Sequence, residues 1–313
     1  MKNIIIFLTT AIFLTVFPQN TFAKNTFVAS NNPTYMILTE IVGTKAALHR
    51  LVPPGASPHT YAPTASDMLK LNTADAVFYI SDHLDAWVAK LGSSKIIALT
   101  TLLPKANRMY FGEKHSHEGH KHDHAGHKHD NDGHKHDNEK DHRVVDPHFW
   151  TDPQAVKALL PALVKTLTKL DPGNAAVYSA NAKAFSKRLD LLHIKCQKIL
   201  KPFRGESIFL FHPSFRYFLK RYNMVYAGAI ETSPGKEPTM KTTSRIIKKI
   251  KASGTKALFT EPQLPKGPAK VIAEAANLKI FVLDPVGGDK GKKKYSDLIL
   301  YNAKVFARAL KRY

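Results

Sequence analysis

The stretch from Gly173 to Lys201 has no internal proline or glycine and separates two blocks in which short apolar runs alternate with helical patterns. Apolar side chains recur in it at intervals of three, four or seven residues, at Tyr178, Phe185, Leu189, Leu192, Cys196 and Ile199. This spacing is typical of one face of a helix, which at 1.5 Å per residue would be about 40 Å long. Because one continuous helix resists bending, we expect two lobes joined by a single long, rigid linker helix.

The two blocks share one pattern of alternation. Before the linker, the predicted strands are Phe27 to Ala29, Leu51-Val52, Val77 to Ile80 and Ile96 to Leu99, with helices near Thr34 to Gly43, Thr64 to Thr73 and Asp82 to Leu91. After it, the predicted strands are Ile208 to Phe211, Val225 to Ala227, Ala257 to Phe259 and Ile280 to Leu283, with helices near Ser214 to Tyr222, Thr239 to Ser253, Pro265 to Ala276 and Ser296 to Lys311. Such alternation predicts an α/β fold in which each lobe is a mainly parallel sheet flanked by helices.

The ends of these segments divide the chain into four parts. Residues 1–23 combine Lys2, an apolar run and the small residues around Phe22, which is the pattern of a cleavable secretory signal peptide. We expect an N-terminal lobe at 24–170, the linker helix at 171–203 and a C-terminal lobe at 204–313. No later segment is apolar for long enough to span a membrane. The protein is therefore predicted to be exported to the periplasm, with no transmembrane segment once the signal is removed.

Ten of the sixteen histidines lie in one short tract, within which the pentad Gly-His-Lys-His-Asp occurs three times. Imidazole binds borderline-soft metal ions near neutral pH, and a tract with almost no apolar residues cannot form a core. We therefore predict a disordered, metal-collecting loop at 113–143. Its predicted low-affinity ligands are His115, His117, His120, His122, His124, His127, His129, His134, His136 and His142.

The formal net charge is +21, and most of the excess lies in the C-terminal part of the chain. Such a surface could face anionic lipid headgroups or an acidic partner. Nucleic acid is not expected as a partner, because the protein is predicted to be exported and has none of the usual nucleic-acid-binding motifs. Cys196 is the only cysteine, so an intramolecular disulfide is excluded. We expect a monomer stabilised by packing alone, with Cys196 as a small buried residue.

Four candidate metal ligands stand near the carboxyl ends of predicted strands, where open parallel α/β sheets place their ligands. His212 and Asp284 directly follow predicted strands, and His59 lies in a proline-rich loop after another. His148 lies just beyond the histidine-rich tract. Two candidates come from each half of the chain. Three imidazoles and one carboxylate at the junction of the lobes would suit a four-coordinate Zn²⁺ ion.

The other chemically notable residues near these strands have less direct roles. Glu261 lies two residues after a predicted strand, where it could orient a histidine ligand or cap a helix. His49 and His193 lie within helical patterns, and His83 is expected in the first turn of a helix. These three histidines are predicted to be structural rather than ligands.

The chain resembles the zinc-type substrate-binding proteins of bacterial ABC metal importers, within the wider zinc and manganese solute-binding family. The segments that carry the resemblance are Gly55-Ala56-Ser57-Pro58-His59, Asp146-Pro147-His148-Phe149-Trp150, Phe211-His212-Pro213-Ser214-Phe215, Thr260-Glu261-Pro262-Gln263 and Leu283-Asp284-Pro285. The resemblance covers essentially the whole chain after residue 23. It implies Zn²⁺ as the transported ligand and an ABC permease membrane subunit as the partner.

The resemblance also assigns ligation to His59, His148 and His212, with Asp284 or water as the fourth ligand. Manganese-binding relatives tend to have a carboxylate where this chain has His212, so the extra nitrogen favours zinc. The function implied is high-affinity capture of Zn²⁺ and its delivery to a permease, and not an enzymatic activity. The alternatives are a manganese-type binding protein, a zinc-dependent hydrolase, and a periplasmic metal buffer or adhesin.

Overall fold

The computed structural model describes residues 24–91, 95–111, 143–231, 238–289 and 291–311. The predicted signal peptide, residues 1–23, lies outside these ranges, as do all ten histidines assigned to the metal-collecting loop. None of the helices in the described ranges combines the length and the apolar character that crossing a membrane requires.

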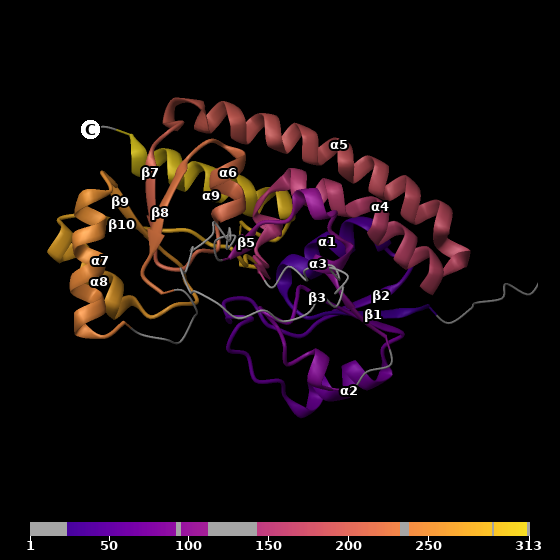
Figure 1. Ribbon diagram of the computed structural model, residues 1–313. Coiled ribbons are helices and arrows are strands. Elements are labelled where there is room, and N and C mark those ends of the chain that lie inside the picture. Colours follow the sequence, from indigo (N-terminus) through magenta and orange to yellow (C-terminus); the bar gives the residue numbers. More distant parts are fainter. Residues whose placement is uncertain (1–23, 92–94, 112–142, 232–237, 290, 312–313) are drawn as a thin grey trace, which may run out of the picture.

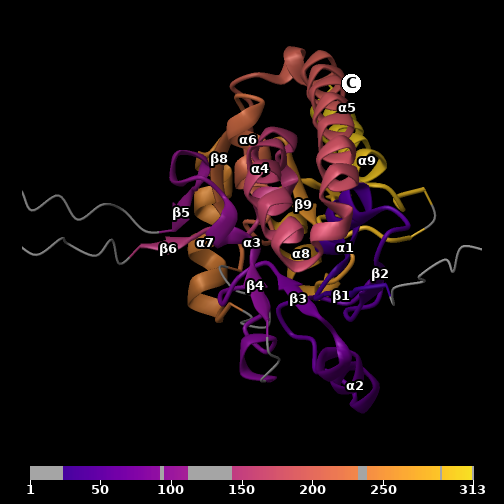
Figure 2. The same cartoon turned by 90° about the vertical axis from the view of Figure 1, so that its right-hand side faces the viewer.

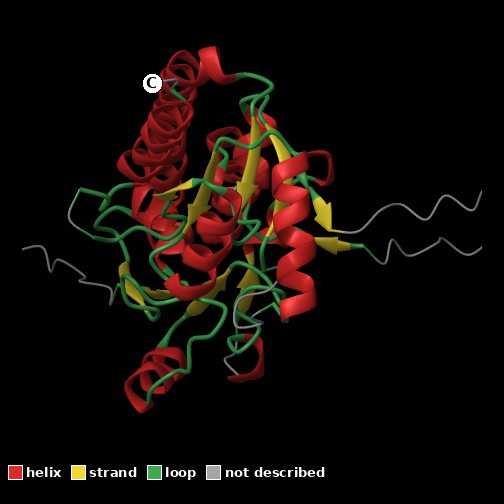
Figure 3. Cartoon of the chain, turned by 90° about the vertical axis from the view of Figure 1, so that its left-hand side faces the viewer, coloured by secondary structure: helices red, strands yellow, loops and turns green. Residues whose placement is uncertain are grey.

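The described chain contains two separate four-stranded parallel sheets (Figure 3). The N-terminal sheet has the strand order β2 (Ala47–Arg50), β1 (Thr26–Ala29), β3 (Ala76–Tyr79) and β4 (Ile96–Ala98). The C-terminal sheet has the order β10 (Lys279–Val282), β9 (Ala257–Thr260), β7 (Ser207–Leu210) and β8 (Val225–Ala229). The strands β3 and β9 are buried along their whole length, which explains why they read as uninterrupted apolar runs in the sequence.

Helices lie beside both sheets and complete the two-lobed α/β architecture that the sequence predicts (Figure 1). In the N-terminal half these are α1 (Asn32–Val42), α2 (Ala65–Thr73), α3 (Leu99–Leu102) and α4 (Pro153–Leu170). In the C-terminal half they are α6 (Arg216–Arg221), α7 (Met240–Ala252), α8 (Lys266–Ala276) and α9 (Tyr295–Leu310). A two-stranded antiparallel sheet, β5 (Tyr110–Phe111) with β6 (Val144–Val145), stands where the chain enters and leaves the histidine-rich tract.

The predicted linker helix is α5 (Ala175–Leu200), which extends along the molecule beside elements of both halves (Figure 1). On the N-terminal side, Asn181 donates a hydrogen bond to the backbone carbonyl of Ile41 in α1, and Arg188 pairs with Glu40 of the same helix. On the C-terminal side, Phe185 packs edge-on against Tyr295 of α9, with the ring centroids 6.0 Å apart. The helix therefore belongs to both lobes and is fixed along its length.

One hydrophobic core continues through both lobes. It includes Phe27 of β1, Phe185 of α5 and Phe259 of β9, together with Phe306 of α9. Because the apolar surface of the two lobes is buried in a common core, separating them would expose part of it to water at a cost of roughly 25 cal/mol per Å². This packing opposes wide opening of the molecule.

Two predicted elements differ in the structure. The strand expected at Leu51-Val52 is β2, which ends before them at Arg50. It lies at the edge of the sheet, so polar side chains occupy it and the apolar signal marks only its end. His49, expected within a helix, is therefore in a strand.

The second difference is the helix expected at Asp82 to Leu91, where turns are found with only one short 3₁₀ segment, Ala89–Leu91. Asp85 accepts hydrogen bonds from the backbone N–H groups of Ile80 and Ser81, and these hold a compact turn in place of a helix. His83 is consequently exposed in a turn rather than in the first turn of a helix.

The packing of α5 predicts the effect of a substitution. Phe185→Ala should lower the free energy of unfolding by about 3–5 kcal/mol, because it removes a ring buried between the linker helix and α9. Leu191→Ala is the matched control on the same helix, since the Leu191 side chain is 59% exposed, and its effect should stay within about 0.5 kcal/mol. Urea unfolding of the three proteins measures both values. Equal losses for the two variants would contradict the role assigned to this contact.

Candidate metal centre

His59 stands at the end of the proline-rich loop that follows β2. Within this loop the N–H of Ala56 bonds to the carbonyl of Pro53 at 3.2 Å, and the indole N–H of Trp87 bonds to the carbonyl of Pro58 at 3.2 Å. Proline restricts the backbone dihedrals on either side of it. The loop is therefore held in shape directly before His59, and the imidazole enters the junction of the lobes from the N-terminal side.

His148 follows the β6 strand and is oriented by a carboxylate two residues earlier. Its Nδ1 lies 2.9 Å from Oδ1 of Asp146, and its backbone N–H bonds to the same oxygen at 3.0 Å. Asp146 is fully buried, and its other oxygen pairs with Arg216 at 3.1 Å. Because Asp146 is bonded to Nδ1, the Nε2 atom of His148 is the ring nitrogen available to a ligand.

His212 is two residues beyond the end of β7, at the carboxyl edge of the C-terminal sheet. The preceding N–H, that of Phe211, bonds to the carbonyl of Phe259, and Ile230 and Glu231 of the segment after β8 bond to the carbonyl of Phe211. These bonds extend the sheet up to the residue before His212. The imidazole is buried, with 3% of the residue exposed.

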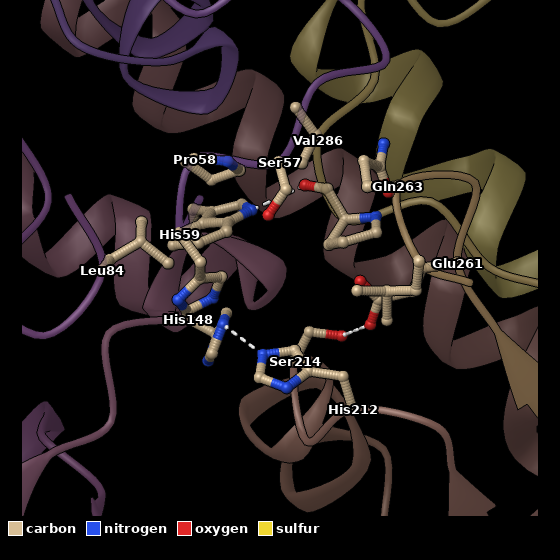
Figure 4. A pocket seen from close by; sticks show the side chains of 13 residues that line it. Ser57, Pro58, His59, Leu84, His148, His212, Ser214, Glu261, Gln263 and Val286 are labelled. Carbon is tan, nitrogen blue, oxygen red and sulfur yellow. Dashed lines mark hydrogen bonds between the residues drawn. The ribbon is translucent and has the colours of Figure 1, made fainter. Parts of the chain in front are cut away.

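The structure brings these three histidines together at the lobe junction (Figure 4). One ring nitrogen from each lies within 4.8 Å of the others, and the Nε2 atoms of His148 and His212 are 3.2 Å apart. The pocket that they line has about 20 Å³ of free space, which is room for about one water-sized particle. Its shape thus suits a single ion rather than an organic molecule.

Burial disfavours the charged form of two of these rings, His59 and His212. Desolvation, reinforced by the nearby His148, lowers the pKa of His59 to about 3. The same causes, with a further contribution from His59, hold the pKa of His212 well below its usual value, although the backbone of Glu231 acts in the opposite direction. Neutral imidazole has a free lone pair, which is the form that binds a metal ion. The site is therefore ready to accept a cation at neutral pH.

Asp284 lies outside this group of three, although the sequence places it at the end of a strand. Its carboxylate pairs with Lys292 and accepts hydrogen bonds from the backbone N–H groups of Val286 and Gly287 and from the side chain of Gln263. Desolvation opposes its ionisation, but these bonds together lower the pKa of Asp284. The carboxylate is thus already compensated by protein groups, and it shapes the loop that follows β10.

Glu261 does line the pocket and directly follows β9. Ser214 donates a hydrogen bond to its carboxyl group (Figure 4), and among the described residues no histidine ring bonds to it. Burial raises the pKa of Glu261 to about 8, and the neighbouring Asp284 adds to this effect. The carboxyl group is therefore mostly protonated at neutral pH while the three rings are unligated.

Two functional residues have no separate role in the sequence analysis, namely Asp146 and Arg216. The signal for Asp146 is its spacing, because a carboxylate two residues before a histidine can reach Nδ1 of that ring across a tight turn. Arg216 carries no comparable local signal. It reaches Asp146 from α6, far along the chain, and only the fold brings the two together.

The site can bind a borderline metal ion through nitrogen. Three imidazoles around a small enclosed space match the ligand preference of Zn²⁺, whereas Mn²⁺ prefers carboxylate, carbonyl and water oxygens. Three protein ligands leave one position of a tetrahedral ion for another group. Glu261 and Gln263 line the opposite wall of the same pocket (Figure 4).

Comparison with known proteins agrees with this arrangement. The chain is 38% identical over 156 residues to the high-affinity zinc uptake system protein ZnuA of Brucella abortus (strain 2308), with 49% of this chain and 47% of that relative covered, so the match spans about half of the relative's length. It is 28% identical over 263 residues to the metal ABC transporter substrate-binding lipoprotein SloC of Streptococcus mutans, with 82% and 79% covered.

A solved structure shares the fold. The crystal structure of a ZnuA deletion mutant with zinc bound has a TM-score of 0.72 and 25% identity, and the match covers 93% of this chain and all of that one. Residues 27–309 of the chain match the family described as "Zinc-uptake complex component A periplasmic". Since this match takes in both sheets and the linker helix, the protein belongs to the family of periplasmic zinc-uptake component A proteins.

Proposed function

We propose that this protein captures Zn²⁺ in the periplasm and delivers it to the membrane permease of an ABC-type uptake system. The observation that carries the proposal is the convergence of His59, His148 and His212, three imidazoles from both lobes, on one small pocket. Family membership supports a transport component rather than an enzyme. The relatives named as zinc uptake and metal transporter binding proteins support the same reading.

Zinc is favoured over manganese by the ligand atoms themselves. The three described groups that share the pocket all offer nitrogen, and the nearby carboxylate of Asp284 is paired with Lys292. Zn²⁺ ranks above Mn²⁺ in affinity for nitrogen sites. The ligand set that we propose is therefore His59, His148 and His212, with the fourth position filled by water or by a carboxyl group from the pocket wall.

The histidine-rich tract has a separate role in the proposal. Its ten imidazoles form a lower-affinity reservoir that raises the local concentration of zinc near the pocket. The β5 and β6 strands support this, because they place the two ends of the tract side by side and Asp146, which orients His148, directly follows β6. Export through residues 1–23 and a monomeric state complete the proposal.

Release of the ion is expected to need only small movements. The linker helix α5 is bonded to α1 and packed on α9, and the core is shared by the two lobes. We infer that docking on the permease strains the contact between the lobes and displaces the histidines slightly, which weakens a site that requires all three rings.

The ligand set predicts the effect of removing one imidazole. His59→Ala, His148→Ala and His212→Ala should each lower zinc affinity at the tight site by more than about 100-fold, whereas Asp146→Asn, which keeps the ligands but weakens their orientation, should cost about 10- to 100-fold. Competition with a chelator, followed by native mass spectrometry, measures these values. His83→Ala is the control, since His83 is exposed and outside the group. Unchanged affinity in all three alanine variants would refute the site.

The division of roles predicts the effect of deleting the tract. Removing residues 114–142 should lower the number of zinc ions bound while leaving one tight site at wild-type affinity. Calorimetry counts the ions and separates the two classes. A full-length variant with serine in place of the ten histidines is the control for loop length, and it should behave like the deletion. Loss of the tight site in both variants would show that the tract supplies its ligands.

The two classes of site should also respond differently to acid. Histidines with an ordinary pKa near 6.5 are mostly protonated at pH 5 and release metal, so the tract should lose its ions between about pH 7 and pH 5.5. Since the pKa of His59 is lowered to about 3 and that of His212 is also depressed, these rings stay neutral and the tight ion should remain at pH 5. Counting bound zinc by mass spectrometry after equilibration at each pH tests this order of release.

A further inference from the structure

The strand β2 forms one of the two edges of the N-terminal sheet, and Figure 2 shows it beyond β1 at the side of the molecule. The N–H groups of Ala47 and Leu51 bond to carbonyls on the β1 side. Backbone groups along a parallel strand point alternately to its two sides. The N–H and C=O groups of Leu48 and Arg50 therefore point outward, and no other described segment of the chain bonds to them.

A hollow with about 420 Å³ of free space lies along this edge. Three consecutive residues of β2, Leu48, His49 and Arg50, line one side of it, and Gly288 and Lys293 from the loop after β10 line the other. Because consecutive side chains of a strand point to opposite faces, a hollow that touches all three runs along the strand edge itself. It is much larger than the histidine pocket and is shaped for a length of extended chain.

The charged groups in this hollow are positive. Arg50 is half-buried, and its guanidinium donates a hydrogen bond to the side-chain oxygen of Asn32 and lies over the ring of Tyr35, whose centroid is 5.5 Å away. Lys293 is exposed at the opposite rim. Asp289 directly follows Gly288 in the sequence, and its carboxylate lies 3.6 Å from the ammonium group of Lys292. A half-buried guanidinium held by a neutral amide is poised for a carboxylate, which forms stronger, charge-assisted hydrogen bonds.

We propose that the edge of β2 is a docking site for an extended acidic segment of a partner protein, which adds to the sheet as a further strand and places a carboxylate on Arg50 and Lys293. Main-chain bonds to Leu48 and Arg50 supply affinity in this mode of recognition, and side-chain charge supplies selectivity. A second copy of this chain is a poor occupant, because it would bring Arg50 and Lys293 against their own like charges.

The docking site is connected to the histidine pocket. Asn32, which holds Arg50, also donates a hydrogen bond of 2.8 Å to the carbonyl of Val286, and Val286 lines the pocket. On the other side, an added Cβ at Gly288 would lie 3.1 Å from the ring of Pro54, in the loop that leads to His59. A bound segment that moves Arg50 is therefore separated from the pocket wall by one residue, Asn32. The docking site itself does not depend on which ion the pocket binds.

The test uses the full protein without added metal and the peptide acetyl-Glu-Val-Glu-Val-Glu-amide. Binding should be measurable by calorimetry, with NMR shifts at the amides of Leu48 and Arg50. Arg50→Gln combined with Lys293→Gln should weaken binding at least tenfold. Lys195→Gln combined with Lys198→Gln is the matched control, because it removes two exposed charges from α5, and it should leave binding within twofold.

Two further peptides decide how the segment binds. The glutamine version of the peptide should bind at least tenfold more weakly, and a version N-methylated at alternate amides should lose binding because it cannot pair with β2. Equal binding of the N-methylated peptide would overturn strand addition. An equal loss in the α5 control pair would overturn the site, because the attraction would then be one of net charge alone.

Discussion

The desolvation of three imidazoles at one point is the interaction on which the rest of the structure depends. His148 and His212 are buried, and the three ring centroids lie 5.0 to 5.6 Å apart, so adding a proton to His59 or to His212 is unfavourable. The fold gathers one ring nitrogen from each histidine within 4.8 Å of the others. A divalent cation stabilises this arrangement, because its positive charge attracts the lone pairs of all three rings. The burial of these rings therefore favours a bound cation, whichever ion it is.

Holding such a group together requires support from outside it. His59 and His148 come from the N-terminal half and His212 from the C-terminal half, so the distance between rings depends on how the lobes sit. The helix α5 and the shared core fix that relation. Asp146 then sets the ring of His148, and Arg216, from the other half of the molecule, holds Asp146. His148 is therefore positioned by a pair that also joins the two lobes.

The sequence predicts the features that are repetitive or local. The α5 helix follows from apolar periodicity without proline or glycine, and the places of His59 and His212 follow from their positions after strands of the two parallel sheets. His148 follows the antiparallel strand β6, so this rule does not account for it. Edge strands, and turns that are held by side-chain hydrogen bonds, are not predicted in this way, as β2 and the turn at Asp85 show. The contacts of Asp284 are also not predicted from the sequence. Lys292 reaches that carboxylate through a loop whose course depends on glycines with positive φ at 287 and 288. No local pattern states that a carboxylate will be neutralised by a lysine eight residues later.

The Asp284–Lys292 pair gives the loop after β10 a structural purpose. By closing this loop, the pair places Pro285 and Val286 against the histidine pocket, where the carbonyl of Pro285 accepts the indole N–H of Trp150 at 2.8 Å. The same loop carries Gly288 and Lys293 to the edge of β2. A carboxylate at the end of a strand thus organises one wall of the pocket and one rim of the hollow at once.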